Sequence, residues 1–114
     1  DIAPKEVYSA AIAASSGSGD VVVLDFSTLH PNESSKKIVV INFLYTCSAA
    51  ETTTFWSGTS SGTRLTGDML VFANGWVKGH YNPDGHFKTA AGADLVIARG
   101  GTMLLGGWLN YYLE

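Results

Sequence analysis

Short apolar runs alternate with glycine-containing turns throughout the second half of the chain. The turns recur at nearly even spacing and are marked by Ser57-Gly58, Thr66-Gly67, Asn74-Gly75, Pro83-Asp84-Gly85 and Ala91-Gly92. Short strands separated by such turns every 8 to 12 residues or so, about one turn per strand, are typical of β-sandwiches and barrels. No segment of roughly 20 to 50 residues repeats, which excludes a solenoid or a propeller. The pattern predicts a small all-β domain.

The first half of the chain is predicted to begin with two strands. Residues 6–14 are rich in alanine, which favours a helix, but helices this short are marginal alone. Residues 20–25 contain Val21-Val22-Val23 and strongly favour a strand. The small polar residues 15–19 between them indicate a hairpin, with a short helix over residues 6–14 as the alternative. Residues 27–37 contain Pro31 and several small polar residues, and they are expected to form a loop.

The longest predicted strand covers residues 37–47 and is apolar on both faces. Strict alternation puts Ile38, Val40 and Leu44 on one face and Val39, Ile41, Phe43 and Tyr45 on the other. A strand that is apolar on both faces has to be covered on both. One cover is expected to be the opposite sheet, and the other a terminal segment or a neighbouring subunit.

The remaining strands follow from the positions of the turns. They are expected over residues 51–56, 65–72, 76–81, 86–89, 94–99 and 107–113, with Gly67 as a bulge. Asn74-Gly75 predicts a two-residue hairpin turn, because both residues tolerate positive φ. Residues 82–85 predict a second tight turn and Gly100-Gly101 a third. We therefore expect a single-domain antiparallel β-sandwich of about eight strands, with residues 1–19 as an N-terminal arm or first strand and residues 20–114 as the sandwich.

The composition indicates a surface with few charges. Charged residues make up 15% of the 114 residues, against about 25% in typical domains, and hydrophobic residues make up 46%. The chain has three Trp, five Tyr and five Phe. Protein interfaces have few charges and many aromatic residues, so this composition fits an assembled protein. Strand packing alone also accounts for the aromatic and threonine content, and both interpretations stay open.

Charge and cysteine content disfavour several function classes. The net charge is −3, and Lys36-Lys37 is the one adjacent basic pair, which argues against nucleic-acid binding. The single Cys47 excludes an intrachain disulfide and a cysteine-based zinc site, and slightly favours assembly in a reducing cytoplasm. No apolar stretch is as long as a membrane span, since residues 38–47 are interrupted by Asn42. We expect no nucleic-acid, membrane or cofactor partner.

No residue pattern makes a strong case for catalysis or for a metal site. His80 and His86 flank Asp84 and could hold a metal across the turn, but two half-exposed strand residues are the simpler interpretation. His30 lies in the long loop without an obvious partner. Residues 58–62 read Gly-x-Ser-x-Gly, yet they precede a predicted strand and not the helix that a hydrolase elbow requires. We therefore expect no catalytic residue, no metal ligand and no enzymatic activity.

Carbohydrate chemistry is the alternative that the aromatic residues would serve best. Trp56, Trp76 and Trp108 could stack on sugar rings, and Asp68 and Asp94 could supply the paired acids of a glycosidase. Core packing or subunit contact explains the same tryptophans more simply, because aromatic residues dominate both. The residues that we expect at an interface are Trp56, Trp76, Tyr81, His86, Phe87 and Trp108.

The turn and strand residues over residues 37–113 follow a recognisable order. It consists of Phe55-x-Ser57-Gly58, Leu65-Thr66-Gly67, Ala73-Asn74-Gly75, Phe87-x-Thr89-Ala90-Ala91-Gly92, Leu95, Gly106-Gly107-Trp108 and Tyr111. This order resembles that of small head decoration (cement) proteins of tailed bacteriophages. Most of the matching residues are turn glycines of moderate specificity. The residues before Asp20 and the loop 27–35 depart from the family's pattern.

The resemblance implies a jelly-roll-like fold and a non-enzymatic structural role on the outside of a virion. Such a protein would bind the major capsid protein, form a homotrimer or homodimer, assemble in the host cytoplasm and stabilise the head. Loops 57–62 and 82–86 would face solvent or contact the capsid, and residues 1–18 would become ordered on binding. The alternative is a carbohydrate- or receptor-binding module of a tail fibre or lectin-like protein, and a small sandwich hydrolase is a third possibility.

Overall fold

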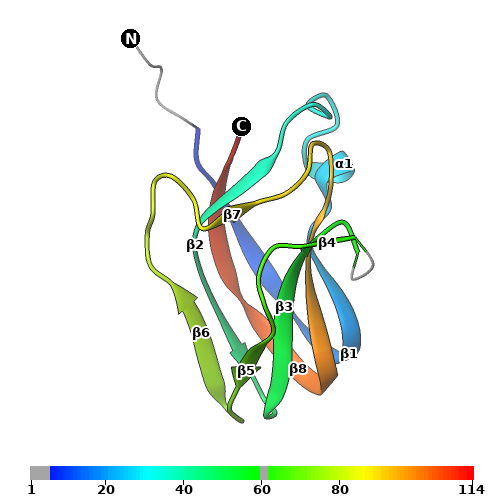
Figure 1. Ribbon diagram of the computed structural model, residues 1–114, viewed down its shortest axis with the longest axis vertical. Coiled ribbons are helices and arrows are strands. Elements are labelled where there is room, and N and C mark those ends of the chain that lie inside the picture. Colours follow the sequence, from blue (N-terminus) through cyan, green and yellow to red (C-terminus); the bar gives the residue numbers. More distant parts are fainter. Residues whose placement is uncertain (1–5, 60–61) are drawn as a thin grey trace.

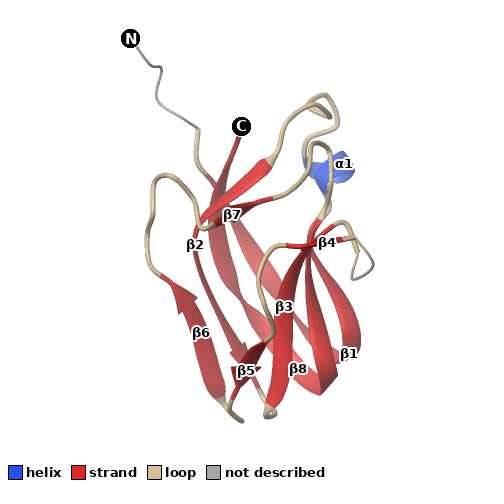
Figure 2. Cartoon of the chain, viewed as in Figure 1, coloured by secondary structure: helices blue, strands red, loops and turns tan. Residues whose placement is uncertain are grey.

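The computed structural model describes residues 6–59 and 62–114, and most of them lie in strands. The strands are β1 (Tyr8–Leu24), β2 (Ile38–Cys47), β3 (Glu51–Ser57), β4 (Thr63–Arg64), β5 (Met69–Val71), β6 (Gly75–Gly79), β7 (Phe87–Lys88) and β8 (Leu95–Leu113). One short helix, α1 (Phe26–Leu29), lies between β1 and β2. The expected all-β, antiparallel, single-domain fold of about eight strands is confirmed (Figure 2).

A long two-stranded ribbon of β1 and β8 joins the two layers of the sandwich. β1 pairs with β8 along its length, from Tyr8 opposite Tyr111 to Leu24 opposite Leu95. The other side of β8 pairs with β3 through residues 95–99 and with β2 through residues 105–113. Figure 1 shows the two strands bending together, so that each contributes one half to each layer. β4 and β5 extend the β3 layer, whereas β6 and β7 extend the β2 layer, and the resulting sheet does not close.

The bend in β1 replaces the predicted hairpin. Residues 6–14 and 20–25 were expected to be two paired strands, but they belong to one continuous strand. Its pairing with β8 is irregular between Ile12 and Ser15 and again between Gly17 and Gly19. Both glycines have positive φ, at 136° and 80°. The polar segment therefore turns a corner within a strand, because β8 stays paired beside it and turns with it.

The bend in β8 corrects a second prediction of the same kind. Residues 94–99 and 107–113 were expected to be separate strands joined by a Gly100-Gly101 turn, but they are the two halves of β8. A Cβ at Gly100 would strike the hydroxyl of Thr52, and one at Gly101 would strike the carboxylate of Glu51. The glycines thus lie where β8 approaches the start of β3 closely, with Gly100 against the short side chain of Thr52, and they do not end the strand.

The buried side chain of Arg99 holds this corner together. Its guanidinium donates hydrogen bonds to the backbone carbonyls of Ser15, Ser18 and Gly19 at 3.1 to 3.2 Å. A buried charge is costly unless hydrogen bonds replace its water. The three carbonyls belong to residues within or next to the irregular parts of β1, so Arg99 and the bend in β1 stabilise each other.

The Asn74-Gly75 turn connects the two layers and does not form a hairpin. The turn itself is where it was expected, with Asn74 at a φ of 59° and the Gly75 N–H 2.8 Å from the Phe72 carbonyl. However, β5 before it pairs with β3, and β6 after it pairs with β2. A tight turn reverses the chain locally, but packing of the side chains decides which strands pair. The strand predicted over residues 65–72 is correspondingly reduced to β5.

A bulge in β2 moves its side chains between faces. The register with β8 shifts between Val40 and Asn42. The residues that face the core are Ile38, Val40, Phe43, Tyr45 and Cys47, whereas Val39 and Ile41 form a separate cluster on the outside. The predicted strict alternation is therefore wrong beyond residue 41, where Leu44 lies outside and Phe43 and Tyr45 lie inside. The extra residue of a bulge inverts the alternation that follows it.

Aromatic rings dominate the core between the two layers. The ring centroid of Phe55 lies 4.7 Å from that of Phe87, 5.2 Å from that of Phe43 and 5.8 Å from that of Tyr45. The Tyr45 hydroxyl hydrogen-bonds to the Thr53 hydroxyl at 2.7 Å, and burial raises the pKa of Tyr45 to about 12. These contacts tie β2 to β3 and hold the outer faces of both layers in place.

Helix α1 (Phe26–Leu29) occupies the first residues of the loop predicted over residues 27–37, where no helix was expected. The Asp25 carboxylate caps it by accepting the Ser27 hydroxyl and the Thr28 N–H, and these bonds lower the pKa of Asp25. His30 follows the helix and is buried, with Nε2 2.9 Å from the Tyr111 hydroxyl. His30 thus has a partner that only the fold brings to it, and it closes one end of the core.

Candidate interaction surface

The outer face of the β2 layer carries two exposed tryptophans. The register places Trp108 of β8 between Ala11 of β1 and Leu44 of β2, and Lys78 of β6 follows Leu44 in the same row. Residues directly opposite each other on antiparallel strands share one face of the sheet. Leu109, the neighbour of Trp108, is buried in the core, so this row points away from it.

A second row completes the surface. Thr46 of β2 lies opposite Trp76 of β6 on one side and Gly106 of β8 on the other, and Leu104 is the next outward residue of β8. Trp76 is 64% exposed, Leu104 49% and Trp108 40%. We call this surface the Trp face, and it consists of Leu44, Thr46, Trp76, Lys78, Leu104 and Trp108.

Two shallow depressions shape the Trp face and its border. One, of about 290 Å³, is lined by Leu44, Thr46, Trp76 and Lys78. The other, of about 370 Å³, runs beside β1 and is lined by Ser9, Ala10, Ala11, Trp108, Leu109 and Asn110. The Ser9 hydroxyl in the second depression donates to Oδ1 of Asn110 at 2.6 Å. Both depressions are mainly apolar, with Lys78 as the single charge among their lining residues, so they suit contact more than chemistry.

The other half of the same outer face is covered by the chain itself. Val39, Ile41 and Tyr112 form a small buried cluster there. The loop after β6 crosses over them, since the Asn82 N–H donates to the Ile41 carbonyl and the His86 N–H to the Val40 carbonyl, both at 2.8 Å. The second cover was expected to be a terminal segment or a neighbouring subunit. For this half the main cover is instead an internal loop, beside which Val7 of the terminal segment lies.

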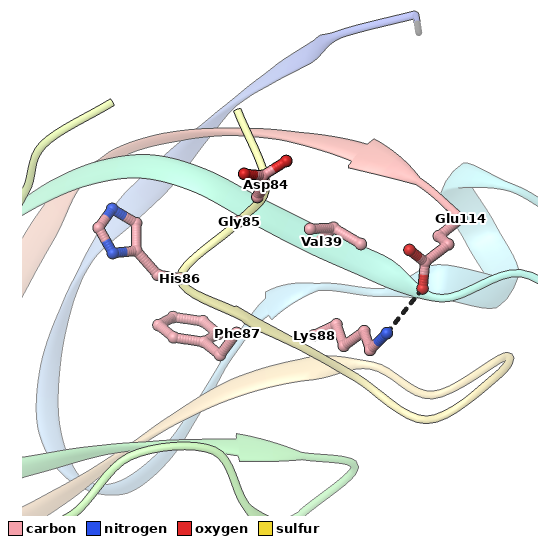
Figure 3. Close-up of a pocket in the computed structure, with 7 residues that line it drawn as sticks. All are labelled: Val39, Asp84, Gly85, His86, Phe87, Lys88 and Glu114. Carbon is pink, nitrogen blue, oxygen red and sulfur yellow. Dashed lines mark hydrogen bonds and ion pairs between the residues drawn. The ribbon is translucent and has the colours of Figure 1, made fainter. Parts of the chain in front are cut away.

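Figure 3 shows how closely this loop approaches β2. Gly85 has a φ of 87° and its N–H donates to the Asn82 carbonyl at 2.9 Å, which confirms the tight turn predicted over residues 82–85. A Cβ on Gly85 would strike Cγ1 of Val39. Beside them, Lys88 Nζ lies 2.9 Å from the Glu114 carboxylate, and this hydrogen bond raises the pKa of Lys88. The small pocket of about 230 Å³ in Figure 3 therefore lies between a turn and an ion pair whose charges are already matched.

The residues considered for metal binding are engaged in turn contacts. His86 directs Nε2 at the backbone carbonyl of His80, and the Asp84 N–H donates to the Asn82 side chain at 3.0 Å. Across residues 6–59 and 62–114, no three potential metal ligands come together. The Gly-x-Ser-x-Gly segment cannot be placed, because Ser60 and Ser61 lie outside the described residues.

The two acids considered for glycoside hydrolysis have separate structural partners. Asp68 accepts the Thr54 hydroxyl at 2.6 Å and lies 3.3 Å from the Arg64 guanidinium. Asp94 accepts the Phe26 N–H at 2.8 Å and thereby anchors the start of α1. Each carboxylate is thus used to hold neighbouring segments of the fold.

The residues expected at an interface are distributed over several places. Trp76 and Trp108 share the Trp face, whereas Trp56 lies on the other layer, with the Arg64 guanidinium 5.2 Å from its ring centroid. Tyr81 and His86 lie in the covering loop and its end, and both are exposed. Phe87 packs into the core against Phe55. The three tryptophans therefore do not form one aromatic platform.

Sequence reasoning missed the two leucines of the Trp face, Leu44 and Leu104. Leu44 was assigned to the face opposite Phe43 correctly but grouped with Val40, because the bulge after Val40 was not recognised. Leu104 lies between the predicted Gly100-Gly101 turn and the strand predicted over residues 107–113, in a stretch that was not assigned. A polar residue is the one signal available in the sequence, since Asn42, at the bulge, interrupts an otherwise apolar strand.

Comparisons with known proteins identify no family for this chain. The sequence matches no protein-family model and no curated protein. A comparison with solved structures finds a chain from the cryo-EM structure of the giant freshwater prawn Macrobrachium rosenbergii extra small virus (XSV) VLP, at 11% sequence identity and a TM-score of 0.42. The match covers 96% of this chain and 78% of that chain. Within the described residues, α1 is the only helix, and with four residues it is too short to cross a membrane.

Proposed function

We propose that this chain is a structural virion protein that decorates a capsid from the outside and binds the major capsid protein through the Trp face. The observation that carries the proposal is an exposed apolar surface, with two tryptophans and one charged residue, on a well-packed sheet layer. Exposed apolar patches on soluble domains mark interaction sites. The resemblance of residues 37–113 to head decoration proteins supports a capsid protein as the partner.

The size of the Trp face suits the centre of a larger contact. A tryptophan side chain has an accessible area of about 250 Å², so Trp76 and Trp108 together expose roughly 250 Å². A specific interface buries about 800 Å² on each partner. Tryptophans at the centre of an interface carry much of its binding free energy, and the surrounding residues mainly exclude water. The two tryptophans would therefore anchor the contact, with neighbouring uncharged residues as its rim.

Co-sedimentation with mature heads of the encoding phage tests this proposal. The double variant Trp76→Ser/Trp108→Ser should bind at least about 100-fold more weakly, because each such anchor typically contributes about 2 kcal/mol or more. Val22→Ser is the matched control, since Val22 is equally exposed but lies on the outer face of the β3 layer. The double variant binding as well as the control would overturn the proposal, and so would purified heads that contain no copy of this chain.

Carbohydrate binding is the second candidate, and the depression beside Trp108 favours it. Ser9 and Asn110 bring polar groups next to an exposed indole there. Sites for small ligands combine apolar walls with a few polar groups in this way. A titration of tryptophan fluorescence with bacterial surface polysaccharides distinguishes the two functions. A change in fluorescence that is lost in Trp108→Ser and kept in Trp76→Ser would favour sugar binding. Sugar binding would be excluded if the fluorescence did not change and the chain still bound to heads.

A further inference from the structure

The free edge of β1 is the longest strand edge that the described structure leaves unpaired. β1 pairs with β8 on one side, and no other strand within residues 6–59 and 62–114 pairs with its other side. β1 has 17 residues, whereas the other edge strands, β4, β5, β6 and β7, have 2, 3, 5 and 2. The backbone N–H and C=O groups along an unpaired edge form a template for another strand.

The short edge strands carry protection that β1 lacks. Arg64 in β4, Lys78 in β6 and Lys88 in β7 place a cation on three of these edges, and β5 is only three residues long. Residues 7–19 contain neither a charged residue nor a proline. Proteins block exposed edges with lysine, proline or short strand length. The regular segment of β1 from Tyr8 to Ile12 lies before the first of its irregularities and carries neither a cation nor a proline, which indicates that a strand pairs with it in the assembled protein.

We propose that β1 pairs in antiparallel orientation with β1 of a second copy of this chain, which produces a symmetric dimer. The regular part of β1 runs from Tyr8 to Ile12, after which the register with β8 is interrupted. A two-fold axis at the centre of this segment places Ala10 opposite Ala10 of the second copy. The same axis places Ser9 opposite Ala11, so each contact occurs twice, as in other two-fold interfaces.

The side chains of this segment favour a second copy as the occupant. Ser9 and Ala11 are small and exposed, so they leave the edge open from the outer face. The segment is uncharged, so two identical strands can approach without repulsion between like charges. The depression of about 370 Å³ that Ser9 and Ala11 line lies along this edge and leaves room for the opposing side chains.

The dimer would join two Trp faces into one surface. A two-fold axis perpendicular to the sheet keeps the outer faces of both copies on the same side, with the two β1 strands in the middle. The two Trp108 residues would then lie three strand spacings apart across the sheet and two residues apart along it, roughly 16 Å. Two Trp faces together approach the exposed area that one partner of a specific interface buries. This last consequence rests on the proposed function, whereas the dimer itself does not.

Sedimentation velocity on the isolated full chain tests the dimer, which should have twice the monomer mass of 12.1 kDa. Ser9→Lys/Ala11→Lys places lysines opposite each other across the axis and should raise the dissociation constant of the dimer at least about 10-fold. Ser9→Glu/Ala11→Glu should do the same. An equimolar mixture of the two variants should restore dimerisation, and this rescue shows that both variants are folded.

Cysteine cross-linking tests the register. Ala10→Cys should give a disulfide-linked dimer on mild oxidation, because opposite Cα atoms on antiparallel strands lie about 4.5 to 5.5 Å apart. Ala14→Cys is the control, since residue 14 would lie far from its counterpart in this register. The native Cys47 is buried and present in both variants.

Several outcomes would overturn the proposal. The wild-type chain could stay monomeric at every concentration or form a trimer. The lysine variant could also dimerise as well as the parent. A monomer whose β1 edge becomes protected from hydrogen exchange only on purified heads would assign the edge to the capsid protein instead. A dimer that does not bind heads would leave this inference intact and remove the proposed function.

Discussion

The two halves of the outer face of the β2 layer both carry apolar side chains but have different surroundings. In one half, Val39 and Ile41 lie beneath the loop after β6 and are almost completely buried. In the other half, Leu44 is only partly buried, and Trp76 and Trp108 beside it are exposed. Both halves carry apolar residues on the outer side of one continuous strand, and Thr46 and Lys78 add polar groups to the uncovered half. The difference lies in a single loop, which the chain provides for one half and not for the other.

This difference shows how an apolar outer face can serve two purposes. A covered apolar residue contributes to folding, because its surface leaves water when the chain folds. The surface of an uncovered apolar residue stays in contact with water after folding, and it leaves water only when another molecule binds there. We therefore expect substitutions in the covered half to change stability, and substitutions in the Trp face to change binding with little effect on stability.

The largest expected difference between the halves is in the cost of removing a side chain. Ile41→Ala should lower the free energy of unfolding by about 2 to 5 kcal/mol, because it leaves a cavity under the loop. Leu44→Ala should cost less than about 1 kcal/mol, since surface positions are tolerant. Urea denaturation measures both values. Equal costs would mean that the Trp face is as well covered as the other half.

The pH dependence of stability reports on the core beneath the Trp face. The pKa of buried Tyr45 is about 12, above its ordinary value of 10.0. The phenol ionises at a lower pH in the unfolded chain than in the folded one. Its contribution to the free energy of unfolding is therefore fully present below pH 10 and is lost as the pH rises through 12, and it amounts to roughly 2 to 3 kcal/mol. Tyr45→Phe should have a shallower loss of stability over this range, as urea denaturation at successive pH values would show. Identical slopes for parent and variant would place the phenol within reach of solvent.

The covering loop can be displaced at its closest contact. Gly85→Ala should lower stability by about 1 to 3 kcal/mol, because it combines strain at positive φ with a clash against Val39. Gly19→Ala is the matched control, since Gly19 also has positive φ but no atom lies near its Cβ position. The difference in their denaturation midpoints isolates the contact with Val39. Should the two variants be equally stable, the loop would not depend on this contact.

The smallest expected effect on stability is that of removing the most exposed tryptophan. Trp76→Ser should change the free energy of unfolding by no more than about 0.5 kcal/mol, as is usual for surface substitutions. Binding of an apolar fluorescent dye to the native protein should nevertheless decrease, because Trp76 lines one of the two depressions on this face. A large loss of stability would show that Trp76 packs as a core residue.

Most strands could be located from the sequence because their signals are local. The turn over residues 82–85 and the strands β2 and β3 formed where the pattern placed them. Which strands pair with each other was harder to predict from the sequence. Asn74-Gly75 forms the expected turn, but the strands that it joins lie in different layers. The corners at residues 15–19 and at Gly100-Gly101 were likewise read as ends of strands. Glycine permits a bend in either case, and the neighbouring strand decides whether pairing continues through it.

The candidate surface was predictable in its residue types but not in its grouping. Trp76 and Trp108 were expected at an interface together with Trp56, yet Trp56 lies on the other layer, and Phe87 lies in the core. Leu44 joined the surface because a bulge inverted the alternation of β2. Such a bulge depends on how two strands pair, which a single stretch of sequence does not contain.

By itself, the sequence determined that this chain forms a small antiparallel all-β domain, because turn residues and apolar alternation act over a few neighbouring residues. It also determined that the surface has few charges and that residues 7–19 contain neither a charged residue nor a proline. Only the tertiary structure decided that β1 is an edge, that one loop covers Val39 and Ile41, and that Trp76 and Trp108 stay exposed on the same outer face. These properties arise from contacts between residues far apart in the chain, whose free energies are comparable for many alternative pairings until the whole core is assembled.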